Sequence, residues 1–160
     1  MYKFVLDADG AIKLAKAGVL EVLAEHSKCL MPQQVYNEVM KGKEKKREDA
    51  FAVEVLVLNK RLKVVEVNTD EIQESLGTGE KAALAAFGRY KAEAIVSDDR
   101  KFLAKLEGRG LPFTTPANII VMLTASKKLT KEEGLHALNK IKNSIREDVY
   151  TKAKEALGGK

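Results

Sequence analysis

The sequence is poor in residues that react through sulfur or imidazole, and this scarcity excludes several kinds of chemistry. Cys29 is the single cysteine among 160 residues. The chain therefore cannot form an intramolecular disulfide or a cysteine-rich zinc site, and a reducing compartment is expected. His26 and His136 are the only histidines, and we expect both on helix surfaces, away from any nucleophile. Catalysis by serine, cysteine or histidine is accordingly not predicted.

Long hydrophobic runs are also missing. The longest apolar stretch, Ala117–Ala125, is interrupted and too short to cross a bilayer, and no charged leader precedes the first predicted strand. We therefore expect a soluble, cytoplasmic protein with no membrane partner. A chain of this length fits one domain that buries a substantial core.

Charge, in contrast, is abundant. Lys, Arg, Asp and Glu make up 32% of the residues, and the net charge is +5. Surplus positive charge is compatible with a polyanionic partner. However, Lys and Glu are interleaved along the chain, which is typical of a solvated surface and of proteins from thermophiles. Charge alone favours the second interpretation.

Short apolar runs alternate with helical patterns along most of the chain. Strands that alternate with helices form a parallel sheet with right-handed crossovers. The predicted fold is therefore α/β: a single-domain, three-layer α/β/α arrangement around a central parallel five-stranded sheet, plus C-terminal helices. The five apolar runs that predict the strands are Phe4–Leu6, Cys29–Met31, Leu62–Val67, Ala94–Ser97 and Leu111–Thr115.

Glycines and prolines predict several helix boundaries. The segment after Gly10 is predicted to form one helix, or two short helices divided at Gly18. Pro32 and Pro116 are expected to begin helices, because the first position of a helix has no hydrogen-bonded N–H to lose. A short helix is also predicted from Asn68 to Gly77.

The last part of the chain is predicted to be helical. The sequence Thr130-Lys131-Glu132-Glu133 is a capping box, which begins one or two basic helices. We assign residues 1–126 to the main domain and residues 127–160 to a C-terminal helical extension of the same domain. The apolar helix at Ile119–Leu123 offers a surface for a homodimer.

Acidic residues follow two of the predicted strands. Asp7 comes directly after the first strand, and Asp98 and Asp99 follow the fourth. Parallel strands end at a common edge of the sheet, and ligands bind at this edge in α/β folds. We therefore expect the three carboxylates to lie near one another. The alternative for Asp7 is a helix N-cap, a frequent role of aspartate.

Two glutamates fall on the apolar faces of predicted helices. Glu38 shares a stripe with Val35 and Val39, and Glu80 shares one with Leu84. A carboxylate on such a face is costly unless it is paired or coordinated. Alternatively, Glu38 lies at the edge of its stripe and reaches water, and Glu80 stabilises a helix N-terminus by roughly 0.3–1 kcal/mol. Both helices leave the same sheet edge, so five carboxylates can converge there.

A cluster of carboxylates requires electrostatic compensation. Two unit charges ~4 Å apart repel by about 4 kcal/mol at an effective dielectric constant near 20. Such a cluster therefore needs raised pKa values or a divalent cation. Oxygen ligands favour Mg²⁺ or Mn²⁺ over zinc, so Mg²⁺ or Mn²⁺ is the expected cofactor.

Four segments carry these acids, and their order and spacing are fairly specific together although each is weak alone. The segments are Phe4-Val5-Leu6-Asp7, Pro32-Gln33-Gln34-Val35-Tyr36-Asn37-Glu38-Val39, Leu76-Gly77-Thr78-Gly79-Glu80-Lys81-Ala82-Ala83-Leu84 and Val96-Ser97-Asp98-Asp99-Arg100-Lys101-Phe102. In them the sequence resembles the PIN domain family, which includes VapC-type toxin ribonucleases and RNA-processing nucleases. The resemblance covers about residues 2–126.

The resemblance implies a ribonuclease that hydrolyses phosphodiester bonds of single-stranded or structured RNA, with a bound metal that lowers the pKa of its water. The implied catalytic residues are Asp7, Glu38, Glu80, Asp98 and Asp99. The implied ligands of Mg²⁺ or Mn²⁺ are Asp7, Glu80, Asp98 and Asp99. The implied substrate-binding residues are Ser97, Lys13, Arg100 and Lys101. An antitoxin or a protein of an RNA-processing complex is the implied protein partner.

Two residues depart from the usual pattern of the family. Glu80 stands where many members have aspartate, although a subgroup has this Gly-x-Gly-Glu form. Asp9 replaces the hydroxyl or amide that commonly follows the first acid. The sequence leaves open whether Asp9 or Asp99 binds metal, and the resemblance carries over to one or both of Asp98 and Asp99.

Two other functions remain open at this stage. The segment Asp7-Ala8-Asp9-Gly10 is also similar to the first motif of haloacid dehalogenase-like phosphatases, in which Asp7 would be a phosphorylated nucleophile. That interpretation leaves Glu38 and Glu80 unused, and the chain lacks the hairpin insert of that family. A non-catalytic PIN-like module that binds RNA or docks on a protein is the other alternative, although every acidic position is retained.

Overall fold

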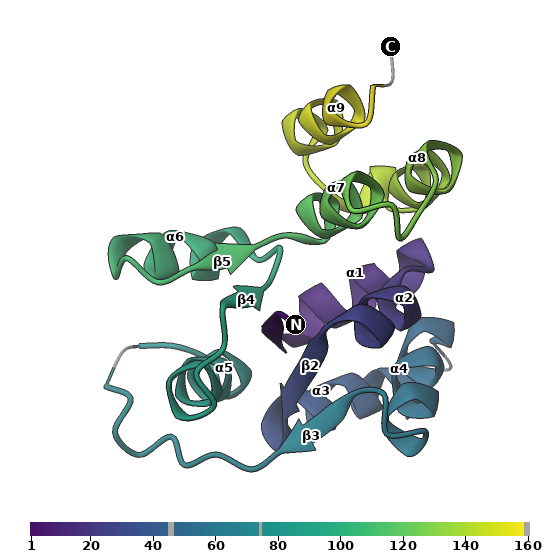
Figure 1. Cartoon of the computed structure of the whole chain (residues 1–160). Helices are drawn as coiled ribbons and strands as arrows, with labels where there is room; N and C mark the ends of the chain where they lie inside the picture. The colour runs from purple at the N-terminus through teal and green to yellow at the C-terminus, as the bar shows by residue number, and fades with distance from the viewer. Residues whose placement is uncertain (45–46, 74, 159–160) are drawn as a thin grey trace.

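A five-stranded parallel sheet forms the centre of the computed structural model, which describes residues 1–44, 47–73 and 75–158. The strand order is β3-β2-β1-β4-β5 (Figure 1). The predicted α/β fold with five parallel strands is therefore confirmed. The strands are β1 Lys3–Leu6, β2 Lys28–Pro32, β3 Lys63–Val65, β4 Ala94–Val96 and β5 Phe113–Thr114.

Helices cover both faces of the sheet. Side chains alternate along each strand, so the apolar strands present hydrophobic side chains to both faces, and both faces need cover. Phe4 and Leu6 of β1 belong to one core cluster, and Val5 between them belongs to the other. The first cluster packs under α1, α2, α3, α4, α7, α8 and α9, and the second under α5 and α6. The helices are α1 Ala8–Ala17, α2 Leu20–His26, α3 Gln33–Glu44, α4 Glu48–Leu58, α5 Thr78–Arg89, α6 Arg100–Gly108, α7 Pro116–Ala125, α8 Lys131–Lys140 and α9 Glu147–Ala156.

Three predicted boundaries can be compared with the structure directly. Gly18 adopts a left-handed conformation with φ of 78° and ends α1, so the alternative of two short helices is the one observed. Pro116 occupies the first turn of α7. Pro32, however, is the last residue of β2 and pairs with Val65 of β3. The prediction that Pro32 begins a helix was wrong by one residue, since α3 starts at Gln33.

The short helix predicted from Asn68 to Gly77 is absent from the described part of this segment, residues 68–73 and 75–77. The side chain of Asn68 accepts a hydrogen bond from the Asp70 amide at 2.8 Å. The Ile72 amide donates to the Thr69 carbonyl. These contacts close a single turn, and side-chain hydrogen bonds of this kind compete with helix formation.

The C-terminal helices cover α7 within the same chain. Ile119, Ile120 and Leu123 are buried together with Leu138 of α8 and Leu157, which follows α9. Figure 1 shows α8 and α9 beyond α7, on the side of the sheet away from α5. The apolar surface at Ile119–Leu123 that was considered for a homodimer is thus already occupied. Among the described residues no helix is both long and apolar enough to cross a membrane.

Candidate active site

Asp7 lies where β1 meets α1, at the carboxyl edge of the sheet. Its side chain is 7% exposed and accepts a hydrogen bond from the Gly10 amide at 2.6 Å, which makes it the N-cap of α1. The Asp7 amide in turn donates to the Val96 carbonyl at the end of β4. These contacts fix the carboxylate between two central strands.

Gly10 allows this close approach. A Cβ atom at position 10 would lie 2.4 Å from the Val96 carbonyl oxygen and 3.0 Å from Oδ1 of Asp7. The first of these distances is far below a van der Waals contact. Glycine is therefore required for α1 to begin directly against β4 with Asp7 as its cap.

The environment of Asp7 favours its neutral form. The pKa of Asp7 is raised to about 7, mainly by burial and to a lesser extent by the nearby carboxylates of Asp9 and Asp99, whereas hydrogen bonds from the Ser97 hydroxyl and the Gly10 amide oppose the rise. The main cause is desolvation of the charged form. A carboxylate held in this way gains from any cation that approaches it.

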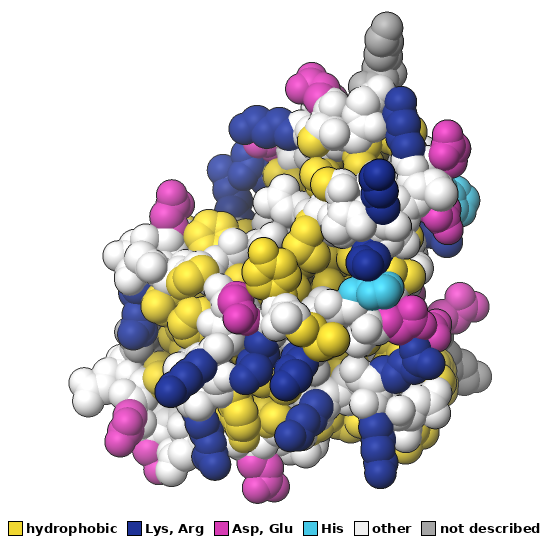
Figure 2. Space-filling model, viewed as in Figure 1, with side chains coloured by type: hydrophobic (Ala, Val, Ile, Leu, Met, Phe, Trp, Pro, Cys, Tyr) yellow, Lys and Arg dark blue, Asp and Glu magenta, His cyan; other side chains and the backbone are white. Residues whose placement is uncertain are grey.

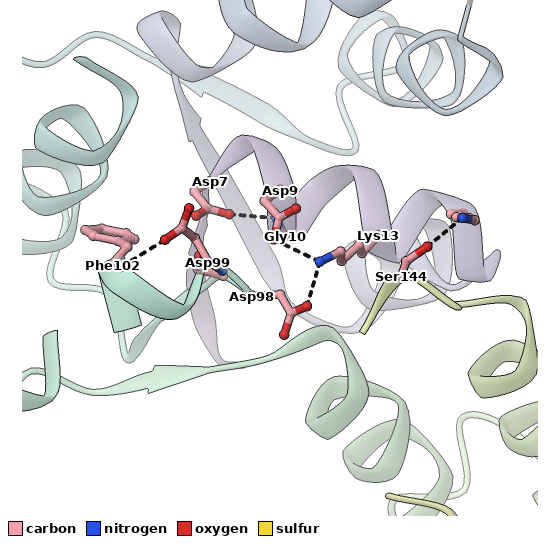
Figure 3. A network of polar contacts seen from close by, with 10 residues as sticks. Asp7, Asp9, Gly10, Lys13, Asp98, Asp99, Phe102 and Ser144 are labelled. Atoms are coloured by element: carbon pink, nitrogen blue, oxygen red, sulfur yellow. Dashed lines mark hydrogen bonds and ion pairs between the residues drawn. The ribbon is translucent and has the colours of Figure 1, made fainter. Parts of the chain in front are cut away.

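Asp99 approaches Asp7 from the neighbouring strand. It is the N-cap of α6, and Oδ1 of Asp99 accepts a hydrogen bond from the Phe102 amide at 3.0 Å. Its own amide donates to the hydroxyl of Ser97 at 3.1 Å. Figure 3 shows the side chains of Asp7 and Asp99 beside one another at the ends of β1 and β4.

Ser97 supports these acids and does not face solvent. Its exposure is 0%, and its hydroxyl contacts both the Asp99 amide and the Asp7 carboxylate. The prediction that Ser97 contacts substrate is therefore corrected, because a fully buried hydroxyl cannot reach RNA. We assign it to the orientation of the two aspartates.

The two glutamates come from helices on opposite faces of the sheet. Oε1 of Glu80 accepts a hydrogen bond from the Gly77 amide at 3.0 Å, at the N-terminus of α5. Glu38 is exposed, whereas Val35 and Val39 beside it are buried. Glu38 thus lies at the edge of the apolar stripe of α3. A Cβ at Gly79 would lie 3.5 Å from Oε1 of Glu38, which places the two helices in contact here.

These carboxylates line one hollow, which we call the acidic cavity. Its volume is about 200 Å³, and it is bordered by Asp7, Ala8, Asp9, Glu38, Gly77, Thr78, Gly79, Glu80 and Asp99. Four of the five predicted catalytic acids therefore meet at one place. Asp9, which the sequence left undecided, borders the cavity as well, and burial raises its pKa as the largest effect.

Asp98 does not border the acidic cavity, in contrast to the prediction. Its carboxylate lies 2.6 Å from the ammonium of Lys13, and Figure 3 shows it apart from Asp7 and Asp99. Lys13 also lies 3.3 Å from Asp9. Its ammonium, only partly exposed, is thus neutralised by two carboxylates, which argues against Lys13 as a phosphate-binding residue. Adjacent residues of the turn after β4 point in different directions, so sequence alone could not separate Asp98 from Asp99.

Positively charged side chains line a hollow next to the acidic cavity. This second hollow, of about 390 Å³, shares Ala8, Asp9 and Glu38 with the acidic cavity and is also lined by Lys41 and Arg47. Arg100 and Lys101 are exposed at the start of α6, directly after Asp99 in the chain, but they do not border the acidic cavity. Sequence analysis missed Lys41 and Arg47, because a mixed charge run is usually only a solvated helix surface.

The chemistry of the donors in the acidic cavity, although not their present arrangement, suits a divalent cation. They are all carboxylate oxygens, the ligands that Mg²⁺ and Mn²⁺ prefer, and the raised pKa of Asp7 indicates a penalty on negative charge that a cation would relieve. Among the described residues, no three or more His, Cys, Asp or Glu side chains are arranged to hold a metal ion. Asp7, Glu80 and Asp99 each direct one oxygen to a backbone amide. The Asp7 carboxylate also accepts a hydrogen bond from Ser97, and each of the three carboxylates keeps lone pairs for a ligand.

Comparison with known proteins gives two findings. A family model described as DUF3368, PIN domain, matches residues 3–158, a range that includes α8 and α9. The crystal structure of PAE2754 from Pyrobaculum aerophilum is similar, with a TM-score of 0.54 and 20% sequence identity over 78% of this chain and 90% of that chain. This likeness supports the fold. No curated protein matches the sequence.

Proposed function

The chain belongs to the PIN domain family, and from this premise we propose that it is a metal-dependent ribonuclease that hydrolyses RNA phosphodiester bonds at the acidic cavity. The observation that carries the proposal is the meeting of Asp7, Glu38, Glu80 and Asp99 from four separate elements around one small hollow. A role at a helix N-terminus would explain Asp7, Glu80 and Asp99 one at a time. It does not explain why all three border the same cavity.

We assign Asp7, Glu80 and Asp99 to the binding of Mg²⁺ or Mn²⁺. When bound, the ion supplies a more acidic water and neutralises charge on the attacked phosphate. Hydrogen bonds with Gly10 and Val96 hold Asp7, so its carboxylate has a defined position. Glu38 is exposed at the rim of the cavity, where its carboxylate is placed to accept a proton from the attacking water.

The surroundings of the acidic cavity support a polyanionic substrate. The hollow that carries Lys41 and Arg47 continues from the acids, and the exposed Arg100 and Lys101 follow Asp99 directly at the start of α6. Phosphates next to the one that is cut would contact these cations. An RNA strand that crosses the cavity from α6 toward α3 and α4 would use both groups of cations.

We predict that the protein cuts end-labelled single-stranded RNA with Mn²⁺ or Mg²⁺ and that EDTA stops the reaction. Asp99→Asn is expected to slow cleavage by about 10³-fold, because it removes a ligand charge worth several kcal/mol. Asp98→Asn is the matched control, with an expected loss below about tenfold, since Asp98 faces Lys13. Gel analysis of the cleavage products measures both rates.

Other results of these assays would contradict the assigned residues or the proposed activity. Equal losses in Asp98→Asn and Asp99→Asn would contradict the assignment of Asp99. Hydrolysis of a generic phosphatase substrate that depends on Asp7 but not on Glu80 would move the protein to the phosphatase interpretation, which the family match does not support. Binding of RNA without cleavage under any metal condition would favour the non-catalytic module.

We predict that Lys41→Ala combined with Arg47→Ala raises KM for RNA by about tenfold and changes kcat much less, because both cations contact substrate outside the acidic cavity. Lys43→Ala is the control, since the ammonium of Lys43 is held 2.7 Å from Glu54. Steady-state kinetics with a fluorescent RNA separates the two constants. A fall in kcat with unchanged KM would contradict a binding role.

The biological setting follows from the family only in outline. An antitoxin partner would make the protein a toxin, whereas a processing complex would make it a maturation nuclease. We propose RNA as the substrate class in both cases.

A further inference from the structure

Three adjacent strands begin with lysine at the edge of the sheet opposite the acidic cavity. Lys3 begins β1, Lys28 begins β2 and Lys63 begins β3. Lys3 and Lys28 are direct neighbours in the parallel register, and Lys63 lies beside Leu30 of β2. Like charges at neighbouring positions of a sheet repel one another, so folding alone does not account for this arrangement.

These lysines border a groove of about 610 Å³, which we call the basic groove. Its charged lining consists of five cations and one carboxylate, which are Lys3, Lys28, Lys60, Arg61, Lys63 and Glu25. Five cations against one carboxylate leave the lining of the groove positively charged. Figure 2 shows Lys and Arg side chains gathered over the region of α5, β2 and β3.

Local structure accounts for only part of this charge. The Lys3 ammonium donates to the Tyr90 carbonyl at 2.9 Å, at the C-terminal end of α5, where a helix attracts cations. Arg61 lies 2.7 Å from Glu25 and 3.9 Å from Glu21.

The remaining three cations, Lys28, Lys60 and Lys63, are exposed, and no hydrogen bond or ion pair of their ammonium groups is present among residues 1–44, 47–73 and 75–158. Three ammonium groups around one concavity form a surface for a chain of negative charges.

We propose that the basic groove is a second RNA-binding surface, which holds the phosphate backbone of the substrate away from the site of cleavage. That the polyanion is RNA rests on the proposed function. The cations lie in the lining together with Ala24 and Tyr90, which carry no charge and are partly exposed, so ribose or base can pack against them. A concave basic surface with an aromatic side chain suits a single strand that presents its phosphates to the cations.

The position of the basic groove limits which RNA can occupy it together with the acidic cavity. The strands are parallel, so the groove and the acidic cavity lie at opposite edges of the sheet. A strand rises about 3.3 Å per residue, and the four residues of β1 therefore separate the edges by more than ~10 Å. An RNA that occupies both sites must therefore extend from one edge of the sheet to the other.

The test compares two charge-matched variants in the inactive Asp7→Asn protein, so that binding is measured without cleavage. Lys28→Ala with Lys63→Ala removes two cations of the basic groove. Lys128→Ala with Lys152→Ala removes two exposed cations elsewhere. Fluorescence anisotropy with a single-stranded RNA of about 30 nucleotides, repeated over a salt series, gives the affinity and its salt dependence.

We expect the groove variant to bind about tenfold more weakly, with a plot of log K against log salt that is less steep by about 1.4, the value for two lost phosphate contacts of a single strand. The matched control is expected to keep the slope and the affinity within twofold. Equal effects in both variants would overturn the basic groove as a site and leave the proposed function intact. Absence of RNA binding in all proteins, together with absence of cleavage by the parent protein, would overturn both.

Discussion

Asp7→Asn is expected to abolish RNA cleavage and, in the metal-free protein at pH 8, to raise the free energy of unfolding by about 4 kcal/mol. The pKa of Asp7 is raised from 3.8 to about 7 in the folded protein, and each unit of difference corresponds to about 1.4 kcal/mol. Asparagine keeps an oxygen for the Gly10 amide and has no charge to desolvate. The aspartate at this position is therefore needed for activity but lowers the stability of the metal-free protein.

The pH dependence gives the sign of this effect. A carboxyl whose folded-state pKa lies above its unfolded value adds stability that is fully present below the unfolded pKa and is lost as the pH rises through the folded pKa. The metal-free parent is therefore expected to lose stability relative to Asp7→Asn between about pH 4 and pH 7. Thermal unfolding in EDTA at several pH values measures the difference.

Two comparisons make this result specific. The exposed Asp70 serves as the control, and Asp70→Asn is expected to follow the parent at every pH. Addition of Mn²⁺ should stabilise the parent and not Asp7→Asn, because binding to the folded state alone raises stability. A difference between the parent and Asp7→Asn that does not change with pH would contradict the burial of an ionisable group as its cause.

Gly10→Ala is expected to destabilise the protein by about 3 kcal/mol, at the upper end of the usual cost of overpacking, and to remove most of the activity. The added Cβ would lie 2.4 Å from the Val96 carbonyl oxygen, which belongs to the backbone of a central strand and cannot rotate away. Relief requires α1 to move from β4. This movement would displace the Asp7 carboxylate that caps α1. Urea unfolding and RNA cleavage are the two measurements.

Gly88→Ala is the matched control for this substitution. Gly88 lies in α5, and a Cβ there would meet no atom within 4 Å. Alanine at an open helical position stabilises by about 0.5–1 kcal/mol. A loss of stability in Gly10→Ala together with a gain in Gly88→Ala would show that the loss comes from the contact between α1 and β4. A small effect of both would show that α1 can shift without cost.

The acidic cavity combines two roles that sequence analysis treated as alternatives. Asp7, Glu80 and Asp99 each accept a hydrogen bond from an amide at the N-terminus of α1, α5 or α6. A cap uses one oxygen of a carboxylate, and lone pairs remain available for a ligand. The positive ends of three helices thus lower the electrostatic cost of placing these acids together. Capping and metal binding are compatible for this reason.

The sequence by itself determined the order of the elements and the edge of the sheet at which the acids lie. Alternating apolar runs and helical patterns are local signals, and parallel pairing then places Asp7 and Asp99 at one edge. The motif around Glu80 could also be recognised from a local signal, since its glycines mark the start of α5. The predicted helix at Asn68–Gly77 failed because a local side-chain contact competed with the helix.

Tertiary structure decided which acids meet and which charges are free. Asp98 and Asp99 are indistinguishable as neighbours in sequence, but α1 brings Lys13 to Asp98, and only Asp99 borders the cavity. Ser97 is buried and its hydroxyl contacts Asp7 and Asp99. Lys41 and Arg47 lie near Asp9 and Glu38 because α1 and α3 pack side by side. The direction of a side chain in a turn depends on contacts between elements that are distant in sequence, and no local pattern contains them.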